Sequence, residues 1–285
     1  MIHTTIAGGI RMGLVALAAS LLAGPAGAAA TLTIEDAAGR AMPATQQHGT
    51  ARAMAMNSAW VGVAEGTPAL QWNPAGLGHL TEAEIGLHHT TGLDKALGET
   101  VILGLPAGAV GGLAAAVDFT DAGEFERRDE YGMLRGAYGA WTLGASAGWG
   151  VGLAHGLAVG AALKGVQQTL DTARYAAYNA DLGVLWKSVE VPGLAVGASW
   201  ANLGLTRASW ALAGGGRVGA SYALSLGGVN RLLVAAAGEI QAKGPNRVNL
   251  GAEDVIMSML AVRAGYLLNL NDQGLSGLNG VTAGL

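Results

Sequence analysis

Apolar residues alternate with small or polar residues along most of this chain from Ala83 onward. The alternation runs in segments of roughly eight to eleven residues, separated by clusters of Gly, Pro, Asn and Asp. Because side chains of a β-strand point alternately to opposite faces, this period of two is typical of strands with one apolar face. We predict twelve strands, at residues 83–89, 99–105, 110–119, 136–149, 156–167, 177–187, 194–200, 217–226, 231–240, 247–255, 260–268 and 278–285.

Charged side chains inside these segments fall opposite the apolar face. Tyr178 and Trp186 share the apolar face of one segment, whereas Asp181 lies on the other. A basic side chain at the lipid-facing midplane of a membrane barrel costs about 2–4 kcal/mol, so the charged face must line a lumen if the apolar face meets lipid. The nearly balanced signs favour a salt-bridged, partly filled interior. We assign to the lumen Glu84, His88, Asp118, Lys164, Asp181, Lys187, Arg217, Glu239, Glu253 and Arg263.

The spacing of tryptophan and tyrosine residues along the strands fits the distance between the two interfaces of a membrane. Trp141 and Trp149 lie on one apolar face, eight residues apart. Eight residues of a tilted strand span roughly 20 Å, and lipid-facing barrels carry aromatic girdles at both interfaces. Trp200, Tyr222 and Tyr266 also fall on outward faces. The chain is therefore predicted to be all-β, a transmembrane antiparallel β-barrel, although aromatic residues in the core of a soluble sandwich can produce part of this pattern.

Two stretches allow other interpretations. Residues 136–163 contain no charged residue and have glycine at every fourth position from Gly144 to Gly160, which also suits a transmembrane helix. On a helix those two glycines would lie about 160° apart, so the glycines would not form one face for packing against another helix. We therefore favour two strands with a turn near residues 152–156. Residues 120–135 are polar, and we interpret them as an extracellular, solvated loop rather than a ligand site.

The N-terminus has the sequence of segments that is typical of an export signal peptide. One basic residue, Arg11, precedes an apolar run from Gly13 to Gly24, and Ala-x-Ala cleavage sites end at Ala28 and Ala30. We therefore divide the chain into a signal peptide at residues 1–30, a lead-in and plug at 31–80, and a barrel at 81–285.

Composition excludes several functions. Only 13% of the 285 residues are charged, against about 25% in soluble domains, while 51% are hydrophobic and 47 are glycine. There is no cysteine, and the net charge of −4 does not suit nucleic-acid binding. His88 and His89 would point to opposite faces, and His79 brings no accompanying carboxylate. We expect no enzyme activity, no metal site and no cofactor.

A motif between Gly49 and Leu77 carries a family resemblance. It opens with Ala-Arg-Ala-Met at 51–54, continues with Ala-Glu-Gly-Thr-Pro-Ala at 64–69 and ends with Trp-Asn-Pro-Ala-Gly-Leu at 72–77. The motif resembles the N-terminal plug of the PorV/PorQ outer-membrane proteins, relatives of the FadL barrels. The chain departs from that family at Asn57-Ser58, where members carry two glycines, and at Glu65-Gly66, where they carry an acidic pair.

The resemblance implies a plug inside the barrel. Trp72 would pack inside, Asn73 and Pro74 would form a turn, and Arg52 or Glu65 would pair with a lumenal charge. The alternative is a helix–turn connector that only packs. The residues assigned to the plug motif are Arg52, Glu65, Trp72, Asn73, Pro74 and Gly76.

The same resemblance implies a place in the cell outer membrane, in contact with its lipid, and leaves two functions open. PorV/PorQ kinship implies a structural or shuttle role towards exported proteins, as in type IX secretion. FadL kinship implies a channel for small hydrophobic molecules. Because FadL-type relatives have fourteen strands and the alternation continues to Leu285 without a terminal aromatic residue, we expect about two further strands beyond that point.

Overall fold

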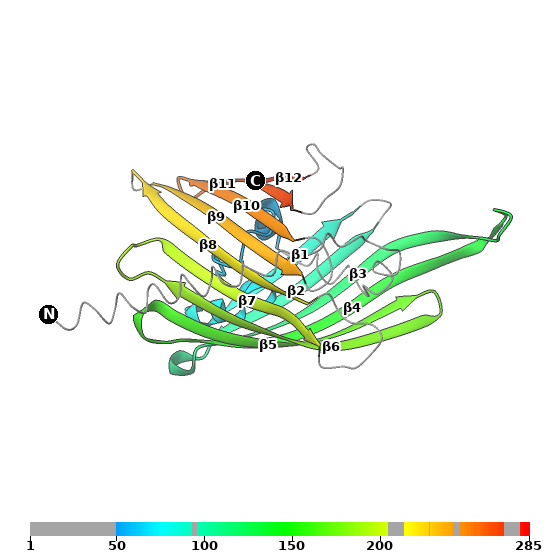
Figure 1. The fold of residues 1–285 in the computed structure, drawn as a ribbon, viewed down its shortest axis with the longest axis horizontal. Coiled ribbons are helices and arrows are strands. Elements are labelled where there is room, and N and C mark those ends of the chain that lie inside the picture. The colour runs from blue at the N-terminus through cyan, green and yellow to red at the C-terminus, as the bar shows by residue number, and fades with distance from the viewer. Residues whose placement is uncertain (1–49, 93–95, 205–213, 228, 242–245, 271–279) are drawn as a thin grey trace.

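The computed structural model describes residues 50–92, 96–204, 214–227, 229–241, 246–270 and 280–285. The predicted signal peptide and the lead-in up to residue 49 lie outside this range. The described residues form one antiparallel sheet of twelve strands, each paired with its neighbours in sequence (Figure 1). The strands are β1 (Glu84–Thr91), β2 (Leu97–Pro106), β3 (Gly112–Arg128), β4 (Leu134–Gly152), β5 (Leu157–Leu170), β6 (Ala173–Lys187), β7 (Leu194–Gly204), β8 (Gly215–Leu226), β9 (Asn230–Gln241), β10 (Arg247–Ile256), β11 (Leu260–Asn269) and β12 (Val281–Gly284).

The prediction of an all-β fold with twelve strands is confirmed. The two strands favoured for residues 136–163 are confirmed as β4 and β5, joined by a short 3-10 turn, η5 (Ala154–Gly156), and the alternative of a transmembrane helix there is excluded. Another 3-10 turn, η4 (Gly108–Val110), joins β2 to β3. In the described part of the chain, no helix is long and apolar enough to cross a membrane.

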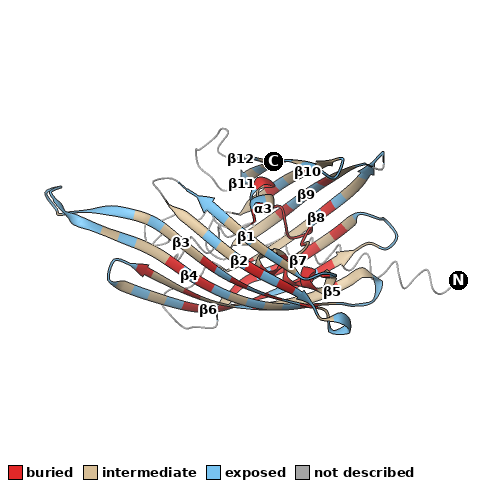
Figure 2. Cartoon of the chain, turned by 180° about the vertical axis from the view of Figure 1, so that it is seen from behind, coloured by how far each residue is buried: buried red, intermediate tan, exposed pale blue. Residues whose placement is uncertain are grey.

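The sheet curves around a short helical segment and has two edges. β1 and β12 stand at opposite ends of the strand order and do not pair with each other in the described residues, so the sheet is not closed there. Figure 2 shows buried and exposed positions alternating along the strands. We call the face towards the helical segment the inner face and the opposite one the outer face.

The alternation has the phase that the sequence indicates. Leu185, on the inner face of β6, is fully buried, whereas its outward neighbours Tyr178 and Leu182 are 58% and 51% exposed. Outward Trp149 and Trp200 are 42% and 43% exposed. The outer face is thus a broad apolar surface, and the inner face carries the core.

Residues Thr50–Leu80, which we call the inner segment, pack against the inner face. The segment contains α3 (Ala51–Ala55), α4 (Ala69–Trp72) and the 3-10 helix η2 (Pro74–His79). Thr50 caps α3, since its hydroxyl oxygen accepts a hydrogen bond from the Ala53 amide at 3.2 Å. Met56, Trp60, Leu70 and Leu77 are the largest fully buried side chains that the segment adds to the core.

α3 ends in a left-handed backbone conformation. Asn57 and Ser58 have φ values of 50° and 62°, a region that glycine adopts without steric cost. Asn57 and Ser58 therefore adopt a backbone that glycine would adopt more easily. The Asn57 side chain also donates to the carbonyl of Gly280 at 2.6 Å, which fixes the turn against the start of β12.

The loop prediction for residues 120–135 is wrong for most of its length. β3 continues to Arg128 and β4 begins at Leu134, so only residues 129–133 form a turn, and Figure 1 shows the hairpin extending far beyond its neighbours. Cross-strand contacts explain the difference. The rings of Phe125 and Tyr138 stack with centroids 5.5 Å apart, and the ladder re-forms after an irregularity between Asp121 and Glu124.

Candidate functional site at the inner face

Glycines of the inner face make room for the backbone of the inner segment. A Cβ on Gly160 would lie 2.4 Å from the carbonyl carbon of Pro74. One on Gly183 would lie 2.1 Å from the Asn73 side-chain oxygen, and one on Gly197 would lie 2.2 Å from the carbonyl oxygen of Val61. Each approach is shorter than a Cβ can make, so the segment sits this deep only because these strand positions lack side chains.

Asn73 anchors the middle of the segment. Its side chain is fully buried, and its Nδ2 donates to the carbonyls of Val61 at 3.1 Å and Val184 at 3.0 Å. Its Oδ1 accepts from the Ala75 amide at 3.2 Å, which caps η2 at Pro74. All the hydrogen-bonding groups of this amide are therefore engaged, and one of its bonds joins the segment to β6.

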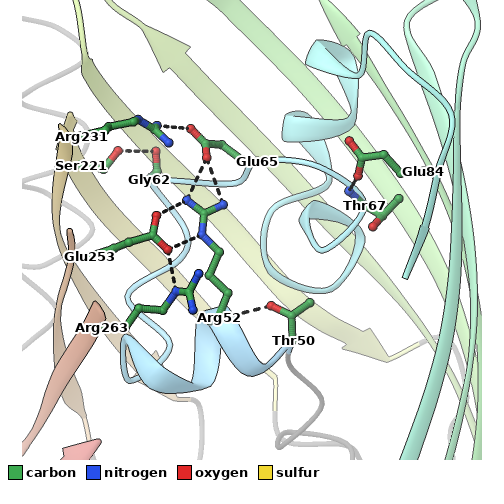
Figure 3. Close-up of polar contacts among 11 residues, drawn as sticks. Thr50, Arg52, Gly62, Glu65, Thr67, Glu84, Ser221, Arg231, Glu253 and Arg263 are labelled. Atoms are coloured by element: carbon green, nitrogen blue, oxygen red, sulfur yellow. Dashed lines mark hydrogen bonds and ion pairs between the residues drawn. The ribbon is translucent and has the colours of Figure 1, made fainter. Parts of the chain in front are cut away.

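An ion-pair network joins α3 to the strands on one side of the sheet (Figure 3). Arg52 donates through Nε and Nη2 to the two oxygens of Glu253, at 2.7 and 2.6 Å. Arg263 of β11 donates to the same carboxylate at 2.6 Å. Glu65 accepts from Arg52 at 3.2 Å and from Arg231 of β9 at 2.8 Å.

The network is compact and partly shielded from water. Glu253 is only 1% exposed, and the guanidinium of Arg52 also lies 4.8 Å from the ring centre of Trp60. Bidentate contacts between arginine and a carboxylate are among the stronger hydrogen bonds in proteins. Burial lowers the pKa of Arg52, but the hydrogen bonds and charges of Glu253 and Glu65 outweigh it and leave that pKa raised.

Further polar contacts fasten the rest of the segment. Glu84 accepts from the Thr67 amide at 2.8 Å, and Gln71 donates to Asp118 at 3.1 Å. The hydroxyls of Ser199, Ser221 and Thr282 donate to the carbonyls of Trp72, Gly62 and Ala55 at 2.9, 3.0 and 2.8 Å respectively. Strands from both halves of the sheet therefore hold the segment.

All ten charged or histidine residues assigned to the lumen lie on the inner face, but they do not form one site. Glu253 and Arg263 belong to the network with Arg52, while Lys164 pairs with Asp181 in a separate group. Arg217 lies 5.3 Å from the ring centre of Trp72 and 3.9 Å from Glu239. His88 shares its face with Glu84, and Lys187 lies on the face of Leu185 at the far end of β6.

The six residues assigned to the plug motif lie in the inner segment. Trp72 is 5% exposed, and Gly76 packs so tightly that a Cβ would lie 2.0 Å from the carbonyl oxygen of Ala64. Glu65 pairs with Arg231, which we did not assign to the inner face. The period of two could have identified it, because Arg231 and Glu239 are eight residues apart on one strand and therefore share a face.

His79, at the end of η2, is a titratable group of the segment with a strongly shifted pKa. Burial, reinforced by the positive charge of Lys187, lowers the pKa of His79 from 6.5 to about 4. The imidazole is therefore neutral at neutral pH. Its Nε2 is buried and has no hydrogen-bond partner among the described residues.

Metal-ligand geometry is not present in the described ranges. No three His, Asp or Glu side chains converge there as ligands. His89 instead contacts Glu99 at 2.7 Å on the outer face, away from His79 and His88.

A cavity of about 90 Å³ lies between the inner segment and the inner face of β7–β11. It lies at the end of the sheet where β8 begins and β9 ends. Its polar lining includes Asn57, Trp72, Arg217, Glu239, Arg247 and Asn249.

Comparison with known proteins does not assign the chain to a family. No family model matches it, and no curated protein matches it.

Proposed function

We propose that this chain is an outer-membrane β-barrel of the PorV/PorQ type, with a structural or shuttle role in the export of proteins to the cell surface. The resemblance of residues 51–77 to the plug of that family supports the proposal. So does the twelve-stranded antiparallel sheet, which curves around that stretch. Closure of the sheet into a barrel belongs to the proposal, because unpaired strand edges are costly in lipid.

The observation that carries the proposal is the occupied inner face. Arg52 contacts β10, Asn73 contacts β6 and Trp72 contacts β8. The glycines at 160, 183 and 197 leave the space that the inner segment occupies. A barrel filled in this way suits a rigid platform for partners better than an open conduit. The acidic and basic β3–β4 hairpin extends from the sheet as a surface for such a partner.

The outer face supports placement in a membrane. Side chains such as Ile85, Leu163 and Tyr178 are largely exposed, and they repeat on alternate positions of successive strands. An apolar surface this broad needs a cover, which lipid would supply.

A channel for small hydrophobic molecules is the alternative. It is favoured by the partial exposure of the side chains that hold α3, 29% for Arg52, 33% for Glu65 and 41% for Arg231. Water can therefore reach the network, and the segment could detach to open a path. In this version of the proposal, the inner segment is a movable plug.

Deleting the gene in the native bacterium separates the two functions. In the secretion role, proteins normally found at the cell surface accumulate in the periplasm, while uptake of a radiolabelled long-chain fatty acid is unchanged. In the channel role, uptake falls and the surface proteins remain in place. Normal surface proteins together with normal uptake would refute both, and complementation with the intact gene controls for effects on neighbouring genes.

A further inference from the structure

The cavity beside Trp72 contains more hydrogen-bond donors than the described residues satisfy. The Trp72 indole Nε1 and the Arg247 Nε are both buried and have no acceptor among those residues, and both side chains line the cavity. Trp72 itself is 5% exposed. Buried donors without partners are rare, and two at one cavity indicate a missing acceptor.

The charges around the cavity also indicate that a negatively charged acceptor is missing. Arg217 and Arg247 contribute two positive charges, and Glu239 contributes one negative charge. Glu239 is shared between both arginines: its Oε1 is 3.9 Å from the Nε of Arg217 and accepts from the side-chain amide of Asn249 at 3.1 Å, and Glu239 is also the cross-strand partner of Arg247. One positive charge is thus left uncompensated, and water filling the cavity would not remove it.

We propose that this cavity binds a small carboxylate, with Arg247 and the Trp72 indole as donors and Arg217 as the second positive charge. A carboxylate offers two acceptor oxygens and one negative charge, which matches the two unpartnered donors and the net charge of the lining. The cavity of about 90 Å³ holds several waters or one anion the size of acetate, since a single water needs about 10–15 Å³. The site is independent of the proposed role in export, because it uses none of the Arg52 network.

Acetate titration of the folded protein in detergent micelles tests the proposal. The Trp72 indole N–H resonance, assigned by its loss in Trp72→Phe, should shift saturably with sodium acetate. Sodium chloride at equal ionic strength should not move it. In Arg247→Gln the acetate midpoint should rise about tenfold, because a hydrogen bond to a charged group is lost.

Two further variants keep the test decisive. Glu239→Gln removes the negative charge of the lining and should lower the acetate midpoint several-fold. Arg174→Gln, on an exposed arginine at the start of β6, should leave the midpoint unchanged. The proposal is overturned if acetate and chloride act alike, if Arg247→Gln folds and titrates like the wild type, or if Glu239→Gln fails to strengthen binding. Those results would mean that the cavity holds water only.

Discussion

At the scale of single residues, Glu253 is the point on which the ion-pair network depends. It is 1% exposed and accepts hydrogen bonds from Arg52 and Arg263, one arginine from the inner segment and one from β11. The desolvation of these charges is tolerated because they are paired. Removing one member therefore costs more than the pair contributes, since the remaining charges stay partly buried.

Replacing Glu253 should accordingly destabilise the fold. We expect Glu253→Ala to lower the free energy of unfolding by about 3 kcal/mol, measured by urea titration in detergent with tryptophan fluorescence as the signal. Glu82→Ala, on an exposed side chain just before β1, is the matched control and should change stability by at most about 0.5 kcal/mol. Equal midpoints for the two variants would show that the network does not hold the segment.

His79 should make stability depend on pH. Its pKa in the folded protein is about 4, below the ordinary value of 6.5, because of burial and the charge of Lys187. Between these values the unfolded chain binds a proton that the folded chain does not, so stability falls as pH drops from 6.5 towards 4. His79→Gln should flatten the urea midpoint over this window relative to the wild type. Parallel pH profiles for the two proteins would contradict the assignment.

At the scale of elements, the period of two was sufficient to locate the strands because the inner and outer faces differ so strongly in chemistry. Residues 120–128 were not recognised as a strand by this period. They are polar on both faces, and their strand conformation is stabilised by the partner strand, as the stacking of Phe125 on Tyr138 shows. A cross-strand contact of this kind is not visible in the pattern of one segment.

The sequence predicted the turns of the inner segment, but not which strand residues the segment contacts. Pro74 and Gly76 indicate a turn, and the alternation places Glu253 on the inner face. Which charge Arg52 would pair with remained open, because the two residues are 201 positions apart in sequence. Likewise, the bond from Asn73 to Val184 depends on how the curved sheet brings distant strands to the segment.

Inner-face glycines should be intolerant of even one added carbon. In Gly160→Ala the new Cβ would collide with the backbone of Pro74, so the inner segment should be displaced and trypsin should cleave after Arg52. Gly165→Ala, on the outer face of the same strand, is the control, since its Cβ would meet only the Tyr178 ring at 3.3 Å. If both variants resist trypsin as the wild type does, the segment does not depend on this close approach.

At the scale of the whole molecule, an inner face filled by the chain's own segment leaves the outer face as the surface that must be covered. If lipid covers it, protein reconstituted in vesicles should lose tryptophan fluorescence when the acyl chains carry bromine, which quenches on contact. Outward Trp149 and Trp200 should both contribute to that loss, whereas fully buried Trp60 should not. The intensity lost to bromine should therefore fall in Trp149→Phe and Trp200→Phe and stay at its wild-type value in Trp60→Phe. Equal fluorescence in brominated and ordinary vesicles would mean that another protein surface covers these residues, and the placement in a membrane would have to be abandoned.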